Sequence, residues 1–271
     1  MFIGEVIMII MNGRVIKNKT INDLKTRTKD NKGLVVIQIG DNYGSRIYIK
    51  QKEKMAEELN ILFKSEVLEE NVDTDAVIEK IQNYNNDLNY SGILVQLPLP
   101  KHLNQDRILA AIAPSKDVDG LRNDSKYLPC TVVGVLELFK YYQIDLNNKK
   151  IVIVGKSRIV GTPLYKYFKN LNLNVILCDS KTIDLKTETI KADVLISAVG
   201  KPCFITEDMV RKEAVVIDVG ISRSYGKLVG DVDFERVKTK CSYITPTPGG
   251  CGPATIGGLA LNLYFEEEKE I

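Results

Sequence analysis

Apolar runs of strand length alternate with amphipathic segments along the first half of the chain. The predicted strands cover residues 34–39, 61–67 and 92–97. The predicted helices cover residues 45–59, 74–85 and 105–112. Ser45 stands at the start of the first of these helices, where a hydroxyl can cap free backbone N–H groups. Strands that alternate with helices in this way predict a parallel sheet covered by helices, an α/β fold.

The N-terminal segment predicts a further strand. Its first eleven residues are apolar apart from Glu5. The run is too short to cross a bilayer, and no basic segment precedes it, so a signal peptide is only a minor alternative. Residues 15–29 are mostly polar and predict at best a short amphipathic helix. We therefore expect no association with a membrane.

A second α/β unit is predicted from about Pro129 onward. A helix over residues 134–142 is expected to link the two halves of the chain. The predicted strands of this unit cover residues 151–154, 174–178, 194–199, 214–218 and 242–244. Their spacing predicts a parallel sheet of the Rossmann type. Residues 253–268 predict a glycine-studded helix, and the pattern does not fix its place in the fold.

A glycine loop follows the first strand of the predicted Rossmann unit. Gly155 ends the apolar run 151–154, and Gly161 comes six positions later, where a helix is expected to begin. Backbone N–H groups and the helix dipole at such a turn can receive a pyrophosphate. The spacing is G-x-S-x-x-x-G, however, and any parallel α/β protein can place a glycine after a strand. Taken alone, this loop leaves a nucleotide site and a purely structural turn about equally favoured.

Composition narrows the possible partners. The chain has 271 residues, of which 44% are hydrophobic and 27% charged, and its formal net charge is +2. No charge of one sign dominates, so nucleic acid is not an expected partner. The five cysteines include no C-x-x-C pair. This pattern favours a reduced, cytoplasmic protein over a disulfide framework or a metal site.

Lys52 is an unusual residue on the predicted helix 45–59. It falls on the same helical stripe as Tyr48, Met55 and Leu59, whereas Lys50 and Lys54 lie on other faces. One interpretation is a lysine whose amine reaches water past the edge of the stripe. The other is a partly desolvated amine with a lowered pKa, suited to acid–base chemistry near neutral pH.

Three further segments carry candidate chemistry. Gln96 ends an apolar strand at the edge where open α/β sheets bind ligands, and its amide needs either a ligand, Lys52 or nearby backbone as a partner. The acidic residues of 116–120 lack the remaining ligands of a calcium loop, so a solvated turn is favoured over a metal site. Residues 245–253 are rich in proline and glycine, and therefore allow either close approach of a ligand or tight turning.

Together these segments resemble the bifunctional methylenetetrahydrofolate dehydrogenase/methenyltetrahydrofolate cyclohydrolase family. The matching segments are 48–52 (YIKQK), 92–100 (GILVQLPLP), 116–120 (KDVDG), 129–131 (PCT), 155–161 (GKSRIVG), 198–202 (AVGKP), 218–221 (DVGI), 230–232 (GDV) and 248–253 (PGGCGP). They run in the family's order from about residue 12 to the end. Each segment is modest support, but the ordered set is highly specific.

The resemblance implies two activities and a set of site residues. Methylene-tetrahydrofolate would give up a hydride to a nicotinamide nucleotide, and the methenyl product would then be hydrolysed to formyl-tetrahydrofolate. Lys52 would be the central acid–base group, Tyr48 would orient the folate, Gln96 would bind Lys52, and Asp119 would anchor the pterin. The implied substrate-binding residues are Tyr48, Lys52, Gln96, Leu97, Asp119, Pro248, Gly249 and Gly250. The implied nucleotide-binding residues are Thr131, Gly155, Lys156, Ser157, Ile159, Ser180, Ala198, Val199, Gly200 and Ile221.

The resemblance also implies an organisation. A folate-binding domain would span residues 1–128 and be completed by the C-terminal helix 253–271, with a Rossmann domain over 129–252 and the active site in the cleft between them. It implies a cytoplasmic homodimer that serves one-carbon metabolism and purine biosynthesis. Val132, Cys251 and Ala254 depart from the residues usual in the family. None of these departures removes a proposed catalytic group.

The residues that would select the nucleotide point in opposite directions. Asp179 stands 24 positions after Gly155, where an acidic side chain normally accepts from a ribose hydroxyl and repels a 2′-phosphate, and where histidine is common in this family. Lys156, Ser180 and Lys181 favour a 2′-phosphate instead, because they supply charge and a hydroxyl donor. We therefore expect NADP, with NAD as the alternative. A dehydrogenase without cyclohydrolase activity, or a non-catalytic nucleotide-binding protein, also stays open.

Overall fold

The computed structural model describes residues 8–27, 32–224 and 226–265, and the chain divides into two compact units. One unit contains the described residues up to Lys17 together with Thr131–Thr255. The other contains Asn18–Cys130 and the described residues from Ile256 onward. We call them the nucleotide unit and the lysine unit, after the Gly155 loop and Lys52 that they respectively contain.

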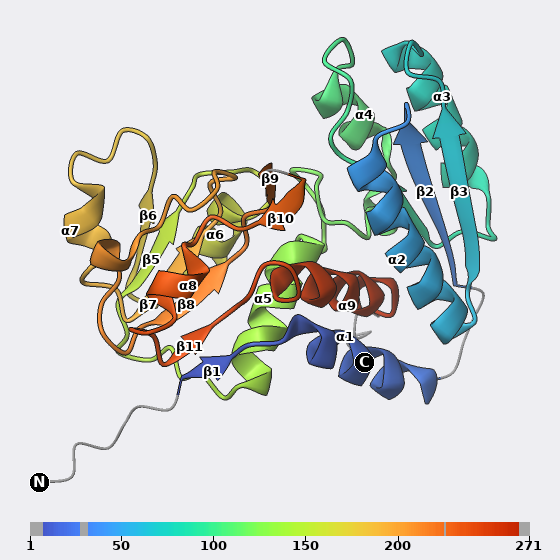
Figure 1. The fold of residues 1–271 in the computed structure, drawn as a ribbon. Helices are drawn as coiled ribbons and strands as arrows, with labels where there is room; N and C mark the ends of the chain where they lie inside the picture. Colours follow the sequence, from blue (N-terminus) through green and yellow to red (C-terminus); the bar gives the residue numbers. More distant parts are fainter. Residues whose placement is uncertain (1–7, 28–31, 225, 266–271) are drawn as a thin grey trace, which may run out of the picture. The chain divides into compact units, whose positions relative to one another are not determined.

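The lysine unit is built on a three-stranded parallel sheet (Figure 1). Its strands are β2 (Gly33–Ile39), β3 (Leu62–Leu68) and β4 (Gly92–Val95), in the order β3-β2-β4. β2 is buried along its whole length because it pairs on both sides, whereas several side chains of the edge strand β3 are exposed. The predicted parallel α/β arrangement is confirmed here.

Helices cover this sheet as the apolar spacing predicted. They are α2 (Tyr43–Leu59), α3 (Thr74–Asn86), α4 (Gln105–Ala111) and the 3₁₀ turn η1 (Pro114–Lys116). The predicted cap of α2 is wrong, because the capping side chain belongs to Asn42, whose Oδ1 accepts from the N–H of Ser45 at 3.0 Å. Ser45 instead lies inside the first turn and is buried.

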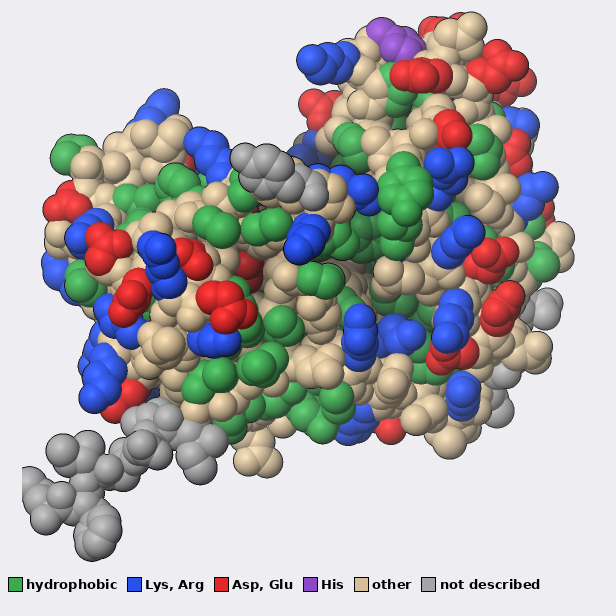
Figure 2. Space-filling view, viewed as in Figure 1, with side chains coloured by type: hydrophobic (Ala, Val, Ile, Leu, Met, Phe, Trp, Pro, Cys, Tyr) green, Lys and Arg blue, Asp and Glu red, His purple; other side chains and the backbone are tan. Residues whose placement is uncertain are grey.

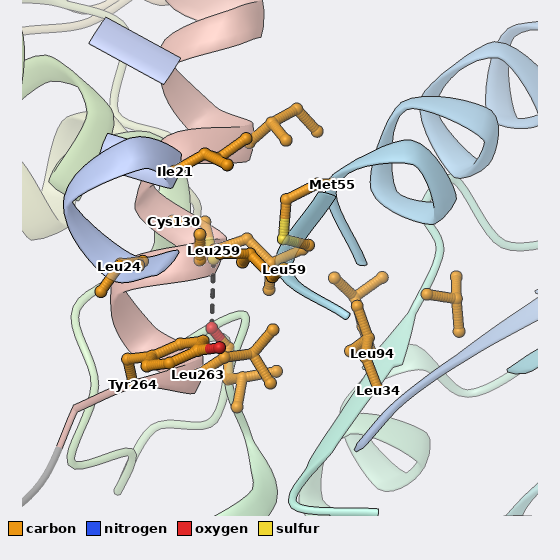
Figure 3. Close-up of a cluster of buried hydrophobic side chains, with 14 of the residues drawn as sticks. Ile21, Leu24, Leu34, Met55, Leu59, Leu94, Cys130, Leu259, Leu263 and Tyr264 are labelled. Carbon is orange, nitrogen blue, oxygen red and sulfur yellow. Dashed lines mark hydrogen bonds between the residues drawn. The ribbon is translucent and has the colours of Figure 1, made fainter. Parts of the chain in front are cut away.

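The core of the lysine unit joins segments from both ends of the chain. Figure 3 shows Leu34 and Leu94 of the sheet near Met55 and Leu59 of α2. Helix α1 (Gly13–Lys25) and helix α9 (Cys251–Leu263) supply four more of the labelled residues. These are Ile21, Leu24, Leu259 and Leu263. The glycine-studded C-terminal helix therefore packs into the core of the unit that contains Lys52.

The nucleotide unit contains a six-stranded parallel sheet in the order β1-β11-β8-β7-β5-β6. Its strands are β1 (Ile9–Ile10), β5 (Ile151–Val154), β6 (Val175–Cys178), β7 (Val194–Ser197), β8 (Val215–Asp218) and β11 (Tyr243–Ile244). Strands β9 (Ser222–Ser224) and β10 (Lys227–Val229) form a separate antiparallel hairpin that the apolar pattern did not predict. The predicted Rossmann-type sheet is confirmed.

Further helical segments accompany this sheet in the described part of the nucleotide unit. They are α5 (Cys130–Tyr141), α6 (Gly161–Asn170), α7 (Leu185–Thr189), α8 (Phe234–Val237) and the 3₁₀ turn η2 (Glu207–Met209). α5 begins four residues before the predicted start at Gly134. That glycine lies inside the helix and permits close packing, because a Cβ there would stand 2.7 Å from the backbone carbon of Ala254 in α9.

The N-terminal strand differs from its predicted place in the first domain. Ile9 and Ile10 pair in parallel with Tyr243 and Ile244 of β11, at the end of the six-stranded sheet. The N–H of Ile9 donates to Ser242 O and that of Met11 to Ile244 O, both at 2.8 Å. This pairing joins segments far apart in sequence, so local patterning gave no sign of it. Residues 1–7 of the predicted strand lie outside the described residues.

The molecular surface agrees with the near-zero net charge. Figure 2 shows acidic and basic side chains interspersed over the viewed face, without a broad field of either sign. Among the helices of the described residues, none combines the length and apolar character needed to cross a membrane. A polyanion such as nucleic acid therefore finds no large basic face in this view.

We expect Asn262 to be a principal polar support of the lysine unit. Its Nδ2 donates to Val118 O at 2.8 Å and to Leu128 O at 2.9 Å, and the residue is 6% exposed. Asn262→Ala leaves these carbonyls without that donor and should lower the free energy of unfolding by about 2 kcal/mol or more. Urea denaturation measures the change. Asn83→Ala, at an exposed site on α3, is the control and should be nearly neutral, and an equal loss in both variants would contradict the assignment.

Candidate active site

The amine of Lys52 is buried and hydrogen-bonded inside the lysine unit. Lys52 lies on the inward face of α2 with Ile49, Met55 and Ala56, and it is only 8% exposed. Its Nζ donates to Gln96 Oε1 at 2.6 Å. The amine is therefore directed toward the end of β4 and does not reach past the helix edge into water. The structure therefore supports the second interpretation of Lys52, a desolvated amine.

Gln96 is held in place by the backbone on both sides of its side chain. Its N–H donates to Ile37 O at 2.8 Å, which continues the pairing of β4 with β2. Its Nε2 donates to Leu97 O at 2.8 Å, so Oε1 is the atom left to face Lys52. The side-chain amide thus has a fixed orientation, and the sheet edge positions the lysine acceptor.

Burial shifts the pKa values of both Lys52 and Asp119. Desolvation lowers the pKa of the Lys52 amine, and the negative charge of Asp119 opposes this by favouring the ammonium form. Burial raises the pKa of Asp119, and the charge of Lys52 opposes that rise. A buried amine and a nearby carboxyl group therefore shift each other's titration, which is typical of acid–base sites.

Cys130 is a third member of this group that the sequence did not single out. Burial raises the pKa of its thiol well above the ordinary value, and Asp119 adds to the rise, so the thiol stays protonated near neutral pH. Its Sγ donates to Val118 O at 3.1 Å, the contact drawn as a dashed line in Figure 3. The only sequence signal was its place beside Thr131 in the PCT segment.

The other predicted folate residues are divided between the units. Tyr48 lies one turn before Lys52 on α2 and is half-buried, and burial raises the pKa of its phenol. Leu97 directly follows Gln96 and is also half-buried. Pro248, Gly249 and Gly250 belong to the nucleotide unit, where they precede α9. The structure of the lysine unit therefore brings together Tyr48, Lys52, Gln96, Leu97 and Asp119.

Asp117 has a structural role in the segment 116–120, whose two acidic residues are spaced as in a calcium loop. Its carboxylate accepts from the N–H of Leu121 at 3.3 Å and of Arg122 at 2.9 Å, and the residue is fully buried. These bonds close the turn that carries Asp119. Within the described ranges, no group of three or more histidine, cysteine or acidic side chains is placed to hold a metal ion.

The strand order of the nucleotide unit creates a switch point of the kind at which open α/β sheets bind ligands. β6 and β7 lie on opposite sides of β5, so the order of strands reverses there. Open parallel sheets bind ligands at such a switch point, beyond the carboxyl ends of the strands. Gly155 directly follows β5 at this point with φ +108°, and a Cβ there would stand 2.4 Å from Ala198 O. Only glycine lets these two loops approach.

The loop after Gly155 is organised by Ser157. Its Oγ accepts from the N–H of Val160 at 3.1 Å and of Gly161 at 3.2 Å, at the start of α6. Lys156 is exposed and Ile159 is half-buried. The hydroxyl holds the helix start in place, while the neighbouring lysine stays available to an anion. This arrangement fits a phosphate-bearing ligand.

The remaining predicted nucleotide residues lie mostly on loops at the same sheet edge. Ala198, Val199 and Gly200 follow β7, and the N–H of Ala198 donates to Val154 O at 2.8 Å. Ser180 is exposed just after β6, and Ile221, which follows β8, is 40% exposed. Thr131 is in the first turn of α5 and accepts from the hydroxyl of Thr255 at 3.4 Å. The structure thus gathers the loops after β5, β6, β7 and β8 at one edge.

Comparison with known proteins identifies the family. The model of the tetrahydrofolate dehydrogenase/cyclohydrolase catalytic domain matches residues 11–119, and that of the NAD(P)-binding domain matches residues 129–270. The chain belongs to the tetrahydrofolate dehydrogenase/cyclohydrolase family. It therefore oxidises methylene-tetrahydrofolate with a nicotinamide nucleotide and hydrolyses methenyl-tetrahydrofolate, as the resemblance implied.

Individual members of the tetrahydrofolate dehydrogenase/cyclohydrolase family match over most of their length. The bifunctional protein FolD of Bacillus licheniformis is 45% identical over 249 aligned positions, and the match covers 88% of each chain. The FolD structure from Campylobacter jejuni has a TM-score of 0.90 at 42% identity and covers 95% of this chain and 97% of its own. The FolD structure from Trypanosoma brucei, complexed with NADP and an inhibitor, has a TM-score of 0.87 at 28% identity and covers 95% of this chain and 96% of its own.

The coupling between Lys52 and Asp119 gives a testable pH dependence. Because the charge of Asp119 favours the ammonium form, Asp119→Asn should lower the pKa of Lys52 further. The amine then stays neutral down to a lower pH than in the parent. The ¹³Cε chemical shift of Lys52 followed against pH measures this change. Asp117→Asn tests whether any acid-to-amide change in this loop has the same effect, and an unchanged or raised pKa in Asp119→Asn would contradict the coupling.

Proposed function

We propose that Lys52 is the acid–base group of the cyclohydrolase reaction and that NADP is the preferred hydride acceptor. The observation that carries the first part is the buried amine, bonded to Gln96 Oε1 at 2.6 Å with its pKa lowered by burial. A lowered pKa makes it easier for the amine to lose and regain a proton, whereas an exposed lysine stays an ammonium ion near neutral pH.

Hydrolysis of the methenyl group requires proton movement at two places. Water adds to the cationic methenyl carbon and loses one proton, which leaves a hydroxyl group on that carbon. The ring then opens as one carbon–nitrogen bond breaks: the nitrogen takes up a proton, and the hydroxyl group loses its own to become the formyl oxygen. The net reaction consumes one water and releases one proton. Neutral Lys52 can accept the proton from the attacking water and return it to the departing nitrogen. A neutral amine also avoids repelling the cationic substrate.

The neighbouring side chains support Lys52 in this proposal. Gln96 fixes the direction of the amine, since its own Nε2 is bound to Leu97 O. Tyr48 lies one turn away on the same helix, where its ring can orient the folate. Asp119 would accept hydrogen bonds from the N–H groups of the pterin, a charge-assisted contact that both reactions require. Leu97 would add apolar contact beside Gln96.

The dehydrogenase reaction makes a different demand on the chain. A nicotinamide nucleotide, when bound, supplies the acceptor of the hydride. The chain has to hold and orient that nucleotide, because positioning of the two reacting rings is the main catalytic requirement. We assign this task to the loops that contain Gly155–Ile159 and Ala198–Gly200, together with Thr131 and Ile221. Pro248, Gly249 and Gly250 would let a ligand approach the backbone closely.

The preference for NADP rests on the loops after β5 and β6. Lys156 and Lys181 are both exposed, and Ser180 adds a hydroxyl donor for a 2′-phosphate. Asp179, which would repel that phosphate, is partly engaged within its own turn. Its Oδ1 accepts from the N–H of Lys181 at 2.9 Å, and its N–H donates to Thr182 Oγ1 at 3.0 Å. The relative from Trypanosoma brucei with NADP bound supports the same choice.

We further propose that the lysine unit, completed by α9, is the folate-binding domain and that the protein is a cytoplasmic homodimer. The core packing of α9 supports the domain assignment. The family resemblance supports the dimer, and analytical ultracentrifugation tests it. The five cysteines are unpaired, which favours a reducing compartment.

Lys52→Met should separate the two activities. It keeps the length and apolar character of the side chain but removes the amine, so α2 should still pack. Cyclohydrolase activity should fall ~10²–10⁴-fold, whereas measurable dehydrogenase activity should remain because hydride transfer moves no proton at the reacting carbon. Methenyl-tetrahydrofolate should then accumulate, which its absorbance reports. Lys54→Met, on an exposed face of α2, is the control, and parental hydrolysis by Lys52→Met would refute the assignment.

Nucleotide preference can be measured by steady-state kinetics. The Michaelis constant for NADP should be lower than that for NAD. Lys156→Gln removes a charge near the expected 2′-phosphate and should raise the constant for NADP roughly 10-fold while leaving NAD unaffected. Lys166→Gln, an exposed lysine on α6, should change neither constant. A lower constant for NAD than for NADP in the parent, at comparable turnover, would overturn the preference.

A further inference from the structure

Two buried aspartates lie at the carboxyl end of the nucleotide-unit sheet, and the roles assigned above use neither. Asp218 is the last residue of β8 and is 3% exposed, and Asp231 is 0% exposed. Burial raises the pKa of Asp218 to about 7, and the charge of Asp231 adds to the rise. Buried carboxyl groups are costly unless their oxygens are well bonded. Their partners therefore indicate what they do.

The carboxylate of Asp231 binds the loop that follows β7. Its Oδ2 accepts from Val199 N at 2.6 Å and from Ser197 Oγ at 3.0 Å, and its Oδ1 accepts from Lys201 N at 2.8 Å. Two of these donors are backbone N–H groups on either side of Gly200. One side chain thus fixes the main chain of the loop Ala198–Lys201 at both of its ends.

Asp218 in turn fixes the main chain of Asp231. Its Oδ1 accepts from Asp231 N at 3.0 Å and from Gly220 N at 3.1 Å, and its Oδ2 accepts from Val232 N at 3.0 Å. The backbone of Asp231 is also held by Ile205 N, which donates to Asp231 O at 2.8 Å. The two carboxylates form a chain of bonds that runs from the end of β8 to the loop after β7.

Gly220 makes room for this arrangement. A Cβ at this position would stand 2.0 Å from the carboxyl carbon of Asp231. Only glycine lets the loop after β8 pass so close to the buried carboxylate. Ile221, the next residue, is one of the proposed nucleotide contacts, so the same contact also constrains the loop on which it lies.

We propose that Asp231, held by Asp218, is a positioning residue for the nucleotide: it preorganises the loop Ala198–Lys201 before NADP binds. This inference rests on the proposed nucleotide role of that loop. A loop that is already ordered loses less conformational freedom on binding, so its ordering contributes directly to affinity. Asp231 acts through backbone N–H groups and makes no contact with the reacting atoms.

The test is Asp231→Asn in the full chain, because the amide keeps the size of the side chain. One carboxylate oxygen becomes an NH₂ group that faces a backbone N–H donor. The dissociation constant for NADP, measured by calorimetric titration without folate, should rise about 10-fold to 100-fold. Amide hydrogen exchange at Val199 and Lys201 should become faster in the variant than in the parent. Exchange in β5 serves as the internal reference. Hydrolysis of methenyl-tetrahydrofolate without nucleotide should proceed at the parental rate, which reports that the chain is folded.

Asp233→Asn is the matched control, since this side chain lies two residues further on and pairs with Arg236 at 3.6 Å near the surface. It should leave the NADP affinity unchanged. Ser197→Ala removes one donor to Asp231 and should raise the NADP dissociation constant about 2-fold to 10-fold. This variant tests the inference if Asp231→Asn fails to fold. Parental affinity in a folded Asp231→Asn, or in Ser197→Ala when that variant alone folds, overturns the inference. A parent that hydrolyses methenyl-tetrahydrofolate but binds no nicotinamide nucleotide overturns the proposed nucleotide role, and the inference with it.

Discussion

The hydrogen bond between Lys52 and Gln96 is the constraint on which the proposed folate chemistry depends. Burying a lysine amine away from water costs free energy unless a well-placed acceptor binds it. Here the acceptor is Gln96 Oε1, just after β4. The bond requires α2 to lie with its lysine facing the sheet edge. It also requires Gln96 to keep its amide turned by the contact with Leu97 O. The sheet, the helix and the loop after β4 therefore position one nitrogen atom.

The two units support their sites by different physical means. In the lysine unit, the buried amine of Lys52 and the buried carboxyl group of Asp119 shift each other's pKa. In the nucleotide unit, carboxylates and a hydroxyl bind backbone N–H groups and so hold loops in shape. The first arrangement suits proton transfer, and the second suits the accurate placement of a ligand.

The sequence revealed those features whose signal is local. Lys52 was recognisable because a cation on an apolar helical stripe breaks the expected pattern, and Gln96 because it interrupts an apolar strand. The parallel sheets followed from alternating strands and helices. The capping of α2 was missed by three residues, since Asn42 and Ser45 are equally plausible caps in a polar turn. Cys130 and Asp231 stood within segments of the family resemblance, but nothing local indicated their roles, because their partners come from other segments of the chain. The pairing of β1 with β11 was hidden for the same reason.

The path of the chain between the units has a consequence for biosynthesis. The core of the lysine unit takes its Leu259 and Leu263 from α9, which follows the whole six-stranded sheet in sequence. On the ribosome, most of the lysine unit emerges first, yet its apolar core stays incomplete until α9 is released. The nucleotide unit likewise gains its β1–β11 pairing only after β11 has been made. Domains of other proteins often fold in turn as they emerge, but in this chain the lysine unit cannot be completed before the nucleotide-unit sheet has been synthesised.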